Sequence, residues 1–522
     1  MADAFDTYRE HFLAAPNAEM SFWIDFSRAQ LPELSPAVRE KLESARKEME
    51  ALEAGAIANQ DEQRMVGHYW LRDSSRAPSP AMTEAIRATI EKIRQFANDV
   101  HTGKVCGSAG KFTDLLCIGI GGSALGPQFI ADALGGANDK LQLHFIDNTD
   151  PDGFDRVFAK LKGRLGNTLA VVMSKSGGTP EPRNGLREAE GQWRSTGLDF
   201  AKHAIVVTGE GSELDKHAVN FLARFPMWDW VGGRTSLFGP VGLVPAALQG
   251  VSIDGLLQGA AEMDVWTRES NPARNPAAQL ARSWLHLTEG KAKRAMVVLP
   301  YKDRLVLFSR YLQQLVMESL GKETDRSGKV VHQGLTVYGN KGSTDQHAYI
   351  QQLRDGPDDF FAVFIEVLRD RDGPSLDVEP GITSGDYLQA FLLGTREALS
   401  GQKKASLTLT VGRVDACSIG QLIALFERAV GIYASMLNIN AYHQPGVEAG
   451  KRAAGEALQV LKLILQYLEK NPGQWHSAST ISKQIGLEGT DETVFKICLR
   501  LSSNGRLECT PHPDPAKATF RL

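Results

Sequence analysis

The stretch that decides the fold runs Leu115-Leu-Cys-Ile-Gly119-Ile-Gly121-Gly-Ser123-Ala-Leu-Gly-Pro127, a short apolar segment that passes directly into a glycine-rich loop. A helix is expected over residues 128–134, so the stretch follows the order strand, loop, helix. Such a loop offers unpaired N–H groups and the positive end of a helix dipole to an anion. The same residues also fit the GxGxxA pattern of dinucleotide-binding loops, with Asp147 as the ribose partner, and a tight turn that binds nothing is a third interpretation.

A second loop of this kind follows two predicted strands later, as Met173-Ser-Lys-Ser-Gly-Gly-Thr-Pro-Glu181. Hydroxyl groups and backbone N–H groups at a strand-to-helix turn can bind phosphate oxygens. A dinucleotide needs only one such loop, so the pair favours a small molecule with a terminal monophosphate. A serine- and threonine-rich turn that only caps a helix is the alternative. The candidate binding residues of the second loop are Ser174, Lys175, Ser176 and Thr179, and those of the first are Gly122 and Ser123.

Apolar runs recur along the chain and predict two parallel sheets. The first series occupies residues 115–120, 141–146, 169–173 and 204–207, and the second occupies 295–299, 335–338, 360–365 and 406–411. Helical stretches separate the runs, as a doubly wound α/β fold requires. After residue 473 the predicted elements follow the order of a winged-helix module. The expected organisation is a helical segment (1–105), a first α/β domain (106–280), a second (281–440), C-terminal helices (441–472) and a small appendix (473–522).

Composition excludes several classes of protein. The 522 residues contain 58 Lys and Arg against 62 Asp and Glu, a net charge of −4, so the chain has no overall basic field for nucleic acid or an anionic membrane. Five cysteines without a CxxC pair indicate reduced thiols and a cytoplasmic protein. No apolar run approaches the length of a membrane span. The sequence has neither HExxH nor an acidic calcium loop, so we expect no metal.

Four further motifs identify a family. They are Asp229-Trp-Val-Gly-Gly-Arg234, Gln314-Leu-Val-Met-Glu318, Gly342-Ser-Thr-Asp-Gln-His347 and Gln444-Pro-Gly-Val-Glu-Ala-Gly-Lys451. With the two loops, they resemble the ordered motifs of the glucose-6-phosphate isomerase family, in its bacterial and plastid branch. Pro445 stands where animal relatives carry tryptophan, and the appendix is not part of the animal pattern.

The resemblance implies two sugar-isomerase (SIS) domains and a cytoplasmic enzyme of glycolysis and gluconeogenesis. Its reaction is the cofactor-free, aldose–ketose isomerisation of glucose 6-phosphate and fructose 6-phosphate, an intramolecular oxidoreduction. Hexose 6-phosphate is the implied ligand, with Gln314 and Gln444 among the residues that bind it. The resemblance also implies a homodimer in which His347 enters the partner's active site, two-fold symmetry giving two equivalent sites.

Aldose–ketose isomerisation requires a base and a group that stabilises enediolate charge. Glu318 is the candidate base, because Gln314 shares its helical face and Gly321 predicts the end of the helix directly after it. The negative end of the helix dipole there disfavours the carboxylate. Arg234 follows two glycines and can hold a permanent positive charge near the C1 and C2 oxygens. Without the family motifs, a solvated Gln/Glu helix face is the simpler interpretation.

Ring opening needs further proton transfers, for which His347 and Lys451 are the candidates. The resemblance assigns the histidine to ring opening and places Lys451 near the ring oxygen, and it stays open which of them donates at each step. A rival hypothesis is a non-catalytic phosphosugar sensor, with the appendix as its DNA-binding module. The nearly balanced charges of the appendix and the presence of both proton-transfer groups argue against it.

Overall fold

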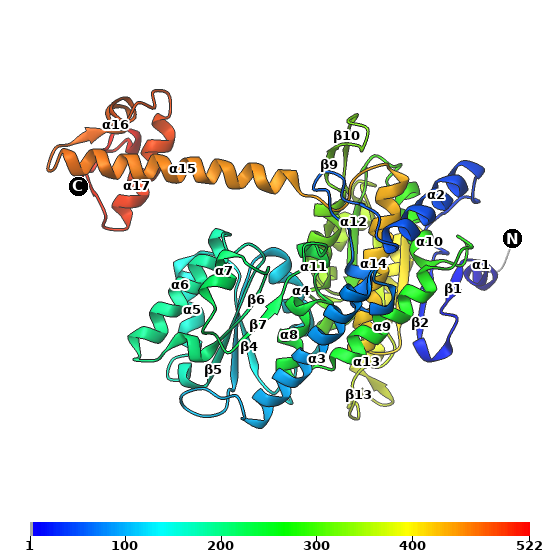
Figure 1. Ribbon diagram of the computed structural model, residues 1–522. Helices are drawn as coiled ribbons and strands as arrows, with labels where there is room; N and C mark the ends of the chain where they lie inside the picture. The colour runs from blue at the N-terminus through cyan, green and yellow to red at the C-terminus, as the bar shows by residue number, and fades with distance from the viewer. Residues whose placement is uncertain (1–3) are drawn as a thin grey trace. The chain divides into compact units, whose positions relative to one another are not determined.

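The computed structural model describes residues 4–522, which form two compact units (Figure 1). The first unit ends at His443, and the second comprises Gln444–Leu522. The sequence analysis places a domain boundary between residues 472 and 473, whereas in the structure residues 444–522 form one compact unit.

The first sheet of the first unit has five parallel strands in the order β4-β3-β5-β6-β7. Alternate residues of β3 face opposite cores, so Leu116 packs with Phe154 and Trp193 while Leu115 packs with Phe129. Burial on both faces explains the continuous apolar runs in the sequence. The strands are β3 (Asp114–Ile118), β4 (Gln142–Ile146), β5 (Thr168–Ser174), β6 (Ala204–Thr208) and β7 (Ala223–Pro226). Their helices are α3 (Pro80–Thr102), α4 (Leu125–Leu134), α5 (Pro151–Lys160), α6 (Pro180–Ser195), α7 (Glu213–His217) and α8 (Pro240–Gln249).

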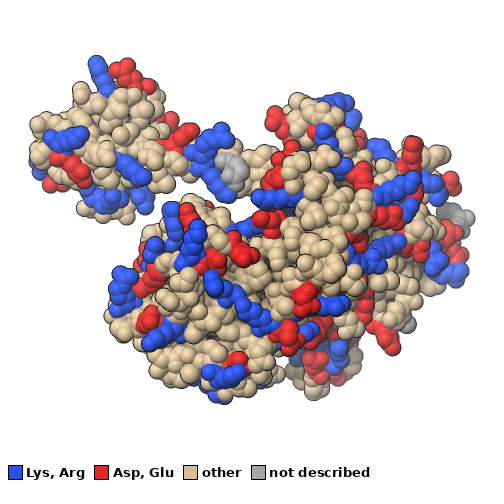
Figure 2. Space-filling model, viewed as in Figure 1, with Lys and Arg blue, Asp and Glu red and all other residues tan. Residues whose placement is uncertain are grey.

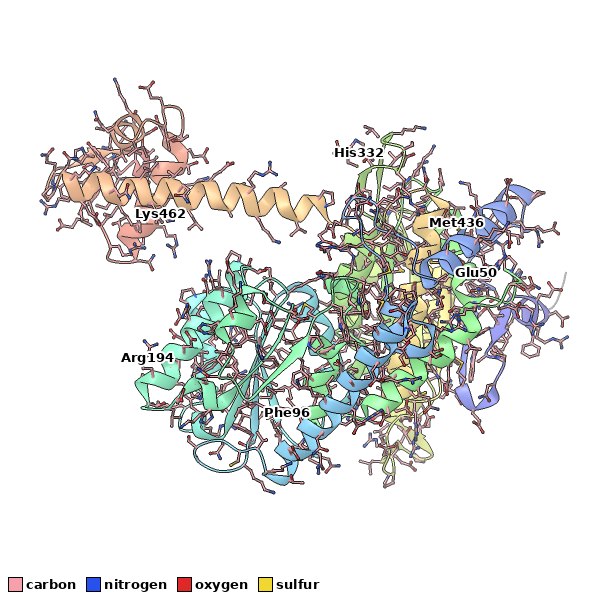
Figure 3. All side chains as sticks on the ribbon, viewed as in Figure 1. Glu50, Phe96, Arg194, His332, Met436 and Lys462 are labelled. Atoms are coloured by element: carbon pink, nitrogen blue, oxygen red, sulfur yellow. The ribbon has the colours of Figure 1, made fainter. Side chains whose placement is uncertain are left out.

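Local sequence sets where these helices begin and end, as α3 shows. The Ser79 side chain accepts a hydrogen bond from the Met82 N–H, Pro80 opens the first turn, and Gly103 ends the helix in the left-handed conformation. Phe96, which is labelled in Figure 3, lies on α3. It packs edge-on against Phe225 of β7, with ring centroids 5.7 Å apart. The helix therefore contacts β7, the edge strand of the first sheet, and packs against α8.

The second sheet has six strands in the order β1-β2-β15-β12-β8-β11. β11, β8, β12 and β15 run parallel, while β2 is antiparallel to β15 and β1 antiparallel to β2. The expectation that residues 1–105 are helical is therefore wrong for β1 and β2. Phe22 and Ile24 are buried on β2, but four residues are too few to show a strand period in the sequence. The strands are β1 (Phe12–Ala14), β2 (Phe22–Asp25), β8 (Ala295–Pro300), β11 (Val337–Tyr338), β12 (Phe360–Val367) and β15 (Ser406–Val411).

Long helices and two hairpins complete the first unit. Among residues 4–522, one helix, Ala416–Met436, has the length and apolarity of a membrane span, and most of it is buried inside the unit. Positive and negative side chains are interspersed over the face that Figure 2 shows. The remaining helices are α1 (Ala4–Glu10), α2 (Pro36–Glu53), α9 (Ile253–Thr267), α10 (Pro276–Leu287), α11 (Phe308–Leu312), α12 (Ile350–Asp355), α13 (Ser384–Gly401) and α14 (Ala416–Met436). The hairpins pair β9 (Lys322–Thr324) with β10 (Val330–Gln333) and β13 (Asp377–Glu379) with β14 (Ile382–Thr383).

The second unit is built on α15 (Pro445–Lys470), a helix of 26 residues. The end of α15 supplies Ile464 and Leu468 to a core that also contains Val494, Leu501 and Phe520. The helices and strands expected in the appendix are present, and the assignment to the winged-helix class stays a prediction. They are β16 (His476–Ser477), α16 (Ala478–Gln484), α17 (Asp491–Ser503), β17 (Glu508–Cys509) and β18 (Thr519–Arg521), with the sheet order β16-β18-β17.

Candidate active site

The backbone of the first glycine-rich loop is in close contact with the loop that carries Arg234. A Cβ atom added to Gly122 would lie 2.0 Å from the Gly233 carbonyl oxygen and 2.9 Å from the Arg234 main-chain nitrogen. Gly121 has a φ of +57°, and a Cβ there would lie 3.1 Å from Nε2 of Gln314. Only glycine allows two backbones to approach this closely. The structure therefore brings the first loop, Arg234 and Gln314 together.

Arg234 is buried and makes three described contacts. Its Nη1 lies 3.0 Å from Oε2 of Glu318, and its Nη2 donates to the carbonyl oxygens of Ala441 and His443, each at 3.0 Å. The Arg234 side chain is 4% exposed and that of Glu318 is 22% exposed. Burial lowers the pKa of Arg234, and Glu318 opposes this shift. The partly exposed carboxylate of Glu318 can remove a proton from a bound molecule, and the neighbouring guanidinium of Arg234 can stabilise the negative charge that forms on that molecule.

Glu318 lies on a π-helix, which the sequence did not predict. The segment α11 is α-helical, and it passes into a π-helix over Gln313–Glu318 before the helix ends at Gly321. Such wide turns are rare and occur frequently at functional sites. The predicted helix end at Gly321 is confirmed, and the Gly321 N–H donates to the Met317 carbonyl oxygen at 2.8 Å. Gln314 and Glu318 share this short segment, and Gln314 lies next to Gly121 of the first loop.

The second glycine-rich loop joins β5 to α6. Ser174 Oγ accepts a hydrogen bond from the Gly177 N–H, and Ser176 Oγ accepts one from the Gly178 N–H, both at 3.2 Å. Since each hydroxyl accepts with its oxygen, each O–H stays able to donate. Thr179 is the N-cap of α6, and its side chain makes no capping hydrogen bond. The loop thus offers hydroxyl groups and a helix N-terminus to an anion.

Lys175 ties the second loop to the loop that leads to Arg234. Its Nζ donates to the Asp229 carbonyl oxygen at 3.0 Å and forms an ion pair with the Asp229 carboxylate at 3.3 Å. A longer bond of 3.4 Å reaches the Val231 carbonyl oxygen. Burial lowers the pKa of Lys175, and the Asp229 charge opposes it. The two glycine-rich loops therefore both contact the segment Asp229–Arg234.

His347 is at the end of a 3₁₀ helix, Thr344–His347, where it is exposed. Asp345 is buried in the same loop and accepts hydrogen bonds from the main chain and the side chain of Asn340, at 2.8 and 3.1 Å. Within residues 4–522, no described hydrogen bond or ion pair links His347 with Glu318. Gln444 and Lys451 belong to the second unit, at the beginning of α15, and are not placed relative to Glu318.

Sequence reasoning missed Lys322, the first residue of β9. Lys322 is 5% exposed, and its Nζ donates to the main-chain oxygen of Glu318 at 2.8 Å. The available signal was a lysine directly after Gly321, the residue that ends the helix of the candidate base.

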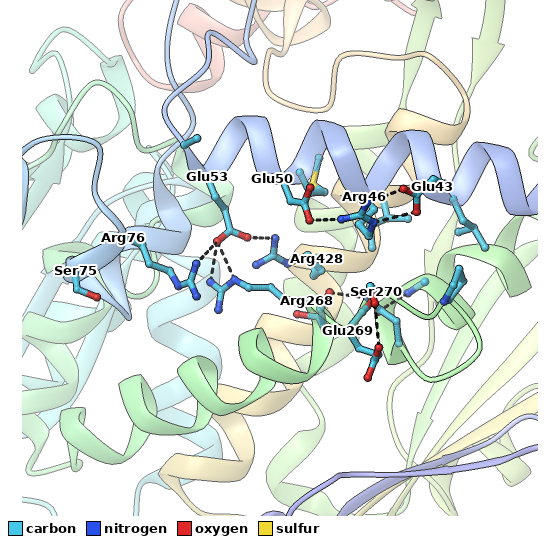
Figure 4. Close-up of a pocket in the computed structure, with 18 residues that line it drawn as sticks. Glu43, Arg46, Glu50, Glu53, Ser75, Arg76, Arg268, Glu269, Ser270 and Arg428 are labelled. Atoms are coloured by element: carbon cyan, nitrogen blue, oxygen red, sulfur yellow. Dashed lines mark hydrogen bonds and ion pairs between the residues drawn. The ribbon is translucent and has the colours of Figure 1, made fainter.

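A cavity of about 550 Å³ lies elsewhere in the first unit, among α2, α9, α10 and α14. Figure 4 shows Glu53 in it, facing the guanidinium groups of Arg76, Arg268 and Arg428. These paired charges belong to the helical core. The predicted site residues do not line this cavity.

Comparisons with known proteins agree with the motifs. A sequence profile described as phosphoglucose isomerase matches residues 25–399 and 389–473. The chain belongs to the phosphoglucose isomerase family. It is 56% identical to a glucose-6-phosphate isomerase of Geobacter sp. (strain M21), over 94% of this chain and 93% of that protein. It is also 56% identical to one of Synechococcus elongatus, over 93% of each chain.

A solved structure of the phosphoglucose isomerase family shares the architecture. A glucose-6-phosphate isomerase from Chlamydia trachomatis superimposes with a TM-score of 0.78 and 26% identity, covering 88% of this chain and 91% of that one. The predicted α/β class with two doubly wound sheets and flanking helices is confirmed, and the second sheet adds the antiparallel strands β1 and β2 to its parallel strands. The sensor hypothesis has no support among these relatives.

Proposed function

We propose that this protein catalyses the reversible isomerisation of glucose 6-phosphate and fructose 6-phosphate. The observation that carries the proposal is the ion pair between Arg234 and Glu318. The backbone of Arg234 and the side chain of Gln314 both lie against the first glycine-rich loop. A carboxylate next to a buried guanidinium supplies both groups that an enediolate reaction needs.

In this mechanism Glu318 removes the proton from C2 of the open-chain aldose. The C2–H electron pair forms the C1–C2 double bond, and the carbonyl electrons move to O1, where Arg234 stabilises the charge. Glu318 then returns its proton to C1, while a proton leaves O2 and another is gained by O1, which gives the ketose. The second loop holds the 6-phosphate through its hydroxyl groups and the N-terminus of α6, which leaves C1 and C2 for Glu318.

Ring opening precedes this step and requires a proton for the ring oxygen and removal of one from O1. His347 and Lys451 are the groups we assign to it, with the order of transfer between them open. Gln444, just before Lys451, is assigned to substrate binding.

We infer that the enzyme is a homodimer with shared active sites, because His347 is exposed and makes no described contact with Glu318. The His347 loop is attached to α13, since Gln346 Nε2 donates to the Phe391 carbonyl oxygen at 3.2 Å. Several large hydrophobic side chains are exposed on α13 and on or next to the β13–β14 hairpin, and a second copy of the chain would cover them. They are Leu376, Val378, Ile382, Phe391 and Leu393.

Refolding of mixed variants tests the shared site. Glu318→Gln and His347→Ala proteins, each inactive alone, are unfolded, mixed equally and refolded. In a shared-site dimer, half of the dimers are mixed and one of their two pockets is intact, so about a quarter of wild-type activity returns. If each subunit supplies both groups to its own pocket, no activity returns, although mass spectrometry detects mixed dimers.

A coupled assay tests the activity, with fructose 6-phosphate supplied and glucose 6-phosphate detected without added metal. In deuterium oxide the enzyme should also introduce deuterium at C2 of the glucose 6-phosphate formed. Glu318→Gln should abolish both signals while it keeps affinity for a phosphorylated sugar acid, because the amide preserves shape and removes the base. Deuterium entry in this variant would refute Glu318 as the base.

A further inference from the structure

Lys322 contacts the peptide of the candidate base rather than its carboxylate. Its Nζ donates to the Glu318 carbonyl oxygen at 2.8 Å, where the π-helix of Glu318 ends. The last carbonyl groups of a helix have no partner within it, and a lysine after the helix can bind them. The chain turns into β9 at Lys322, so the side chain of Lys322 supplies the hydrogen bond that another turn of helix would have made.

The burial of Lys322 has a free-energy cost that one hydrogen bond does not explain. Lys322 is 5% exposed, and a charged amino group out of water is unfavourable unless it is paired. Arg234, which is also positive, contributes a repulsive charge to the same region. A neutral, apolar side chain would avoid this repulsion, so the position of Lys322 needs an explanation beyond packing.

The charged groups around Lys322 come from several elements. Burial, with the positive charge of Arg234 as the second cause, lowers the pKa of Lys322 to about 7, and Glu318 and Asp61 act in the opposite direction. His443 also faces this group: its Nε2 lies 3.7 Å from Asp61 Oδ2, and Lys322 is among the charges that lower the pKa of its imidazole. Lys322 therefore changes charge near neutral pH, beside Glu318.

We propose that Lys322 is a positioning residue for the base, whose amino group fixes the Glu318 peptide at the end of the π-helix and sets the charge next to the carboxylate. This inference rests on the proposed role of Glu318. The hydrogen bond persists in both charge states, because a neutral amine also donates. The charge does not persist. Protonated Lys322 attracts the carboxylate charge that Glu318 loses when it takes the C2 proton, so it disfavours that proton transfer, and loss of the Lys322 proton favours it.

Two substitutions separate the hydrogen bond from the charge. Lys322→Met removes both, and its C2 exchange rate should fall about 10- to 100-fold with little change in KM, because the carboxylate loses its fixed position. Lys322→Arg keeps a donor and a charge that stays at all pH values. It should recover part of the rate lost in Lys322→Met.

The pH profile gives a readout that a purely structural role would not change. In the wild-type full-length enzyme, deuterium entry at C2 should rise between pH 6 and 8 as Lys322 loses its proton. The Lys322→Arg enzyme should lack this rise. If Lys322→Arg keeps the wild-type rise, another group such as His443 causes it, and the inference about charge is overturned.

Lys404 offers a matched control for the loss of a buried lysine. It is 7% exposed, and its Nζ donates to the Gly356 carbonyl oxygen at 3.0 Å, with no described contact with Glu318. Lys404→Met should keep the wild-type pH profile, whatever its cost in thermal stability. A Lys322→Met enzyme that exchanges C2 as fast as Lys404→Met would overturn the positioning role.

Nuclear magnetic resonance measures Lys322 independently of turnover. In protein labelled with ¹³C at lysine Cε, the signal that disappears in Lys322→Arg should titrate near pH 7, and it should titrate at lower pH in Glu318→Gln, which lacks the attractive charge. Titration above pH 9.5 would refute the inference. Deuterium entry by Glu318→Gln would instead refute the proposed base, so the two failures are distinguishable.

Discussion

Replacement of Gly122 by alanine tests whether close contact between the two loops sets the geometry of Arg234. The new Cβ would lie 2.0 Å from the Gly233 carbonyl oxygen, where real Cβ atoms keep at least 3.0 Å, so the loops must separate by about 1 Å. The atoms in contact are backbone atoms on both sides, which cannot rotate away. Arg234 follows Gly233 directly and must move with it. A misplacement of about 1 Å costs about 100-fold in rate, or about 2.7 kcal/mol of transition-state stabilisation.

The assay is steady-state kinetics in both directions, together with thermal unfolding. For Gly122→Ala we expect kcat to fall about 100-fold with a smaller change in KM, because in the proposed mechanism the displaced guanidinium stabilises the enediolate and does not bind the phosphate. Gly232→Ala is the control in the facing loop, which carries Arg234, since its Cβ would meet Thr235 Oγ1 at an ordinary 3.5 Å. A Gly122→Ala enzyme with kcat within threefold of Gly232→Ala would show that the contact does not position Arg234.

Three further outcomes are expected. Joint replacement of Ser174, Ser176 and Thr179 by alanine should raise KM more than it lowers kcat, because phosphate contacts stabilise the bound substrate and the transition state equally. An unchanged KM would place the phosphate elsewhere. Truncation after Gly473 should expose Ile464 and Leu468, at about 1.5–3 kcal/mol for each side chain, and a soluble truncated protein that binds no more hydrophobic dye than the full chain would contradict this. The unfolding free energy should rise with pH between about 7 and 10.5, by at most about 1.4 kcal/mol per pH unit from Lys322, because the unfolded chain binds the proton that folded Lys322 has lost. Urea unfolding of Lys322→Met should show a smaller rise, and an equal rise would refute the assignment.

The first sheet and its two loops were predictable because they combine signals that agree. Strands buried on both faces give continuous apolar runs, and each loop follows such a run with glycines and a helix start. The strand predicted at 406–411 coincides with β15, and the one at 169–173 lies within β5. Family motifs added Arg234 and Glu318, which the spacing of residues alone did not distinguish from a surface ion pair and a solvated helix face.

The remaining features depend on tertiary contacts that leave little trace in the sequence. The spacing of Gln314 and Glu318 fits an α-helix and a π-helix equally well, so the wide turn became visible only in the structure. Lys322 is read from sequence as a solvent-exposed residue, since lysine is rarely buried. Strands β2 and β15 are paired, although nearly the whole sequence of the first unit lies between them. No local pattern in four residues predicts that pairing.

The helix α15 changes how the C-terminal appendix should be understood. Lys451 lies near its beginning, and Ile464 and Leu468 near its end are fully buried in the core that the appendix completes. Ile464 is thirteen positions after Lys451, a span of about 20 Å along one helix. Isolated helices are marginal in water, and tertiary packing of an apolar face supplies most of their stability. The core built by α16, α17 and the three short strands therefore stabilises the same helix that carries Lys451. A substitution in that core, such as Phe520→Ala, should loosen α15 from its C-terminal end, and its effect on turnover measures how far the order of Lys451 depends on the appendix.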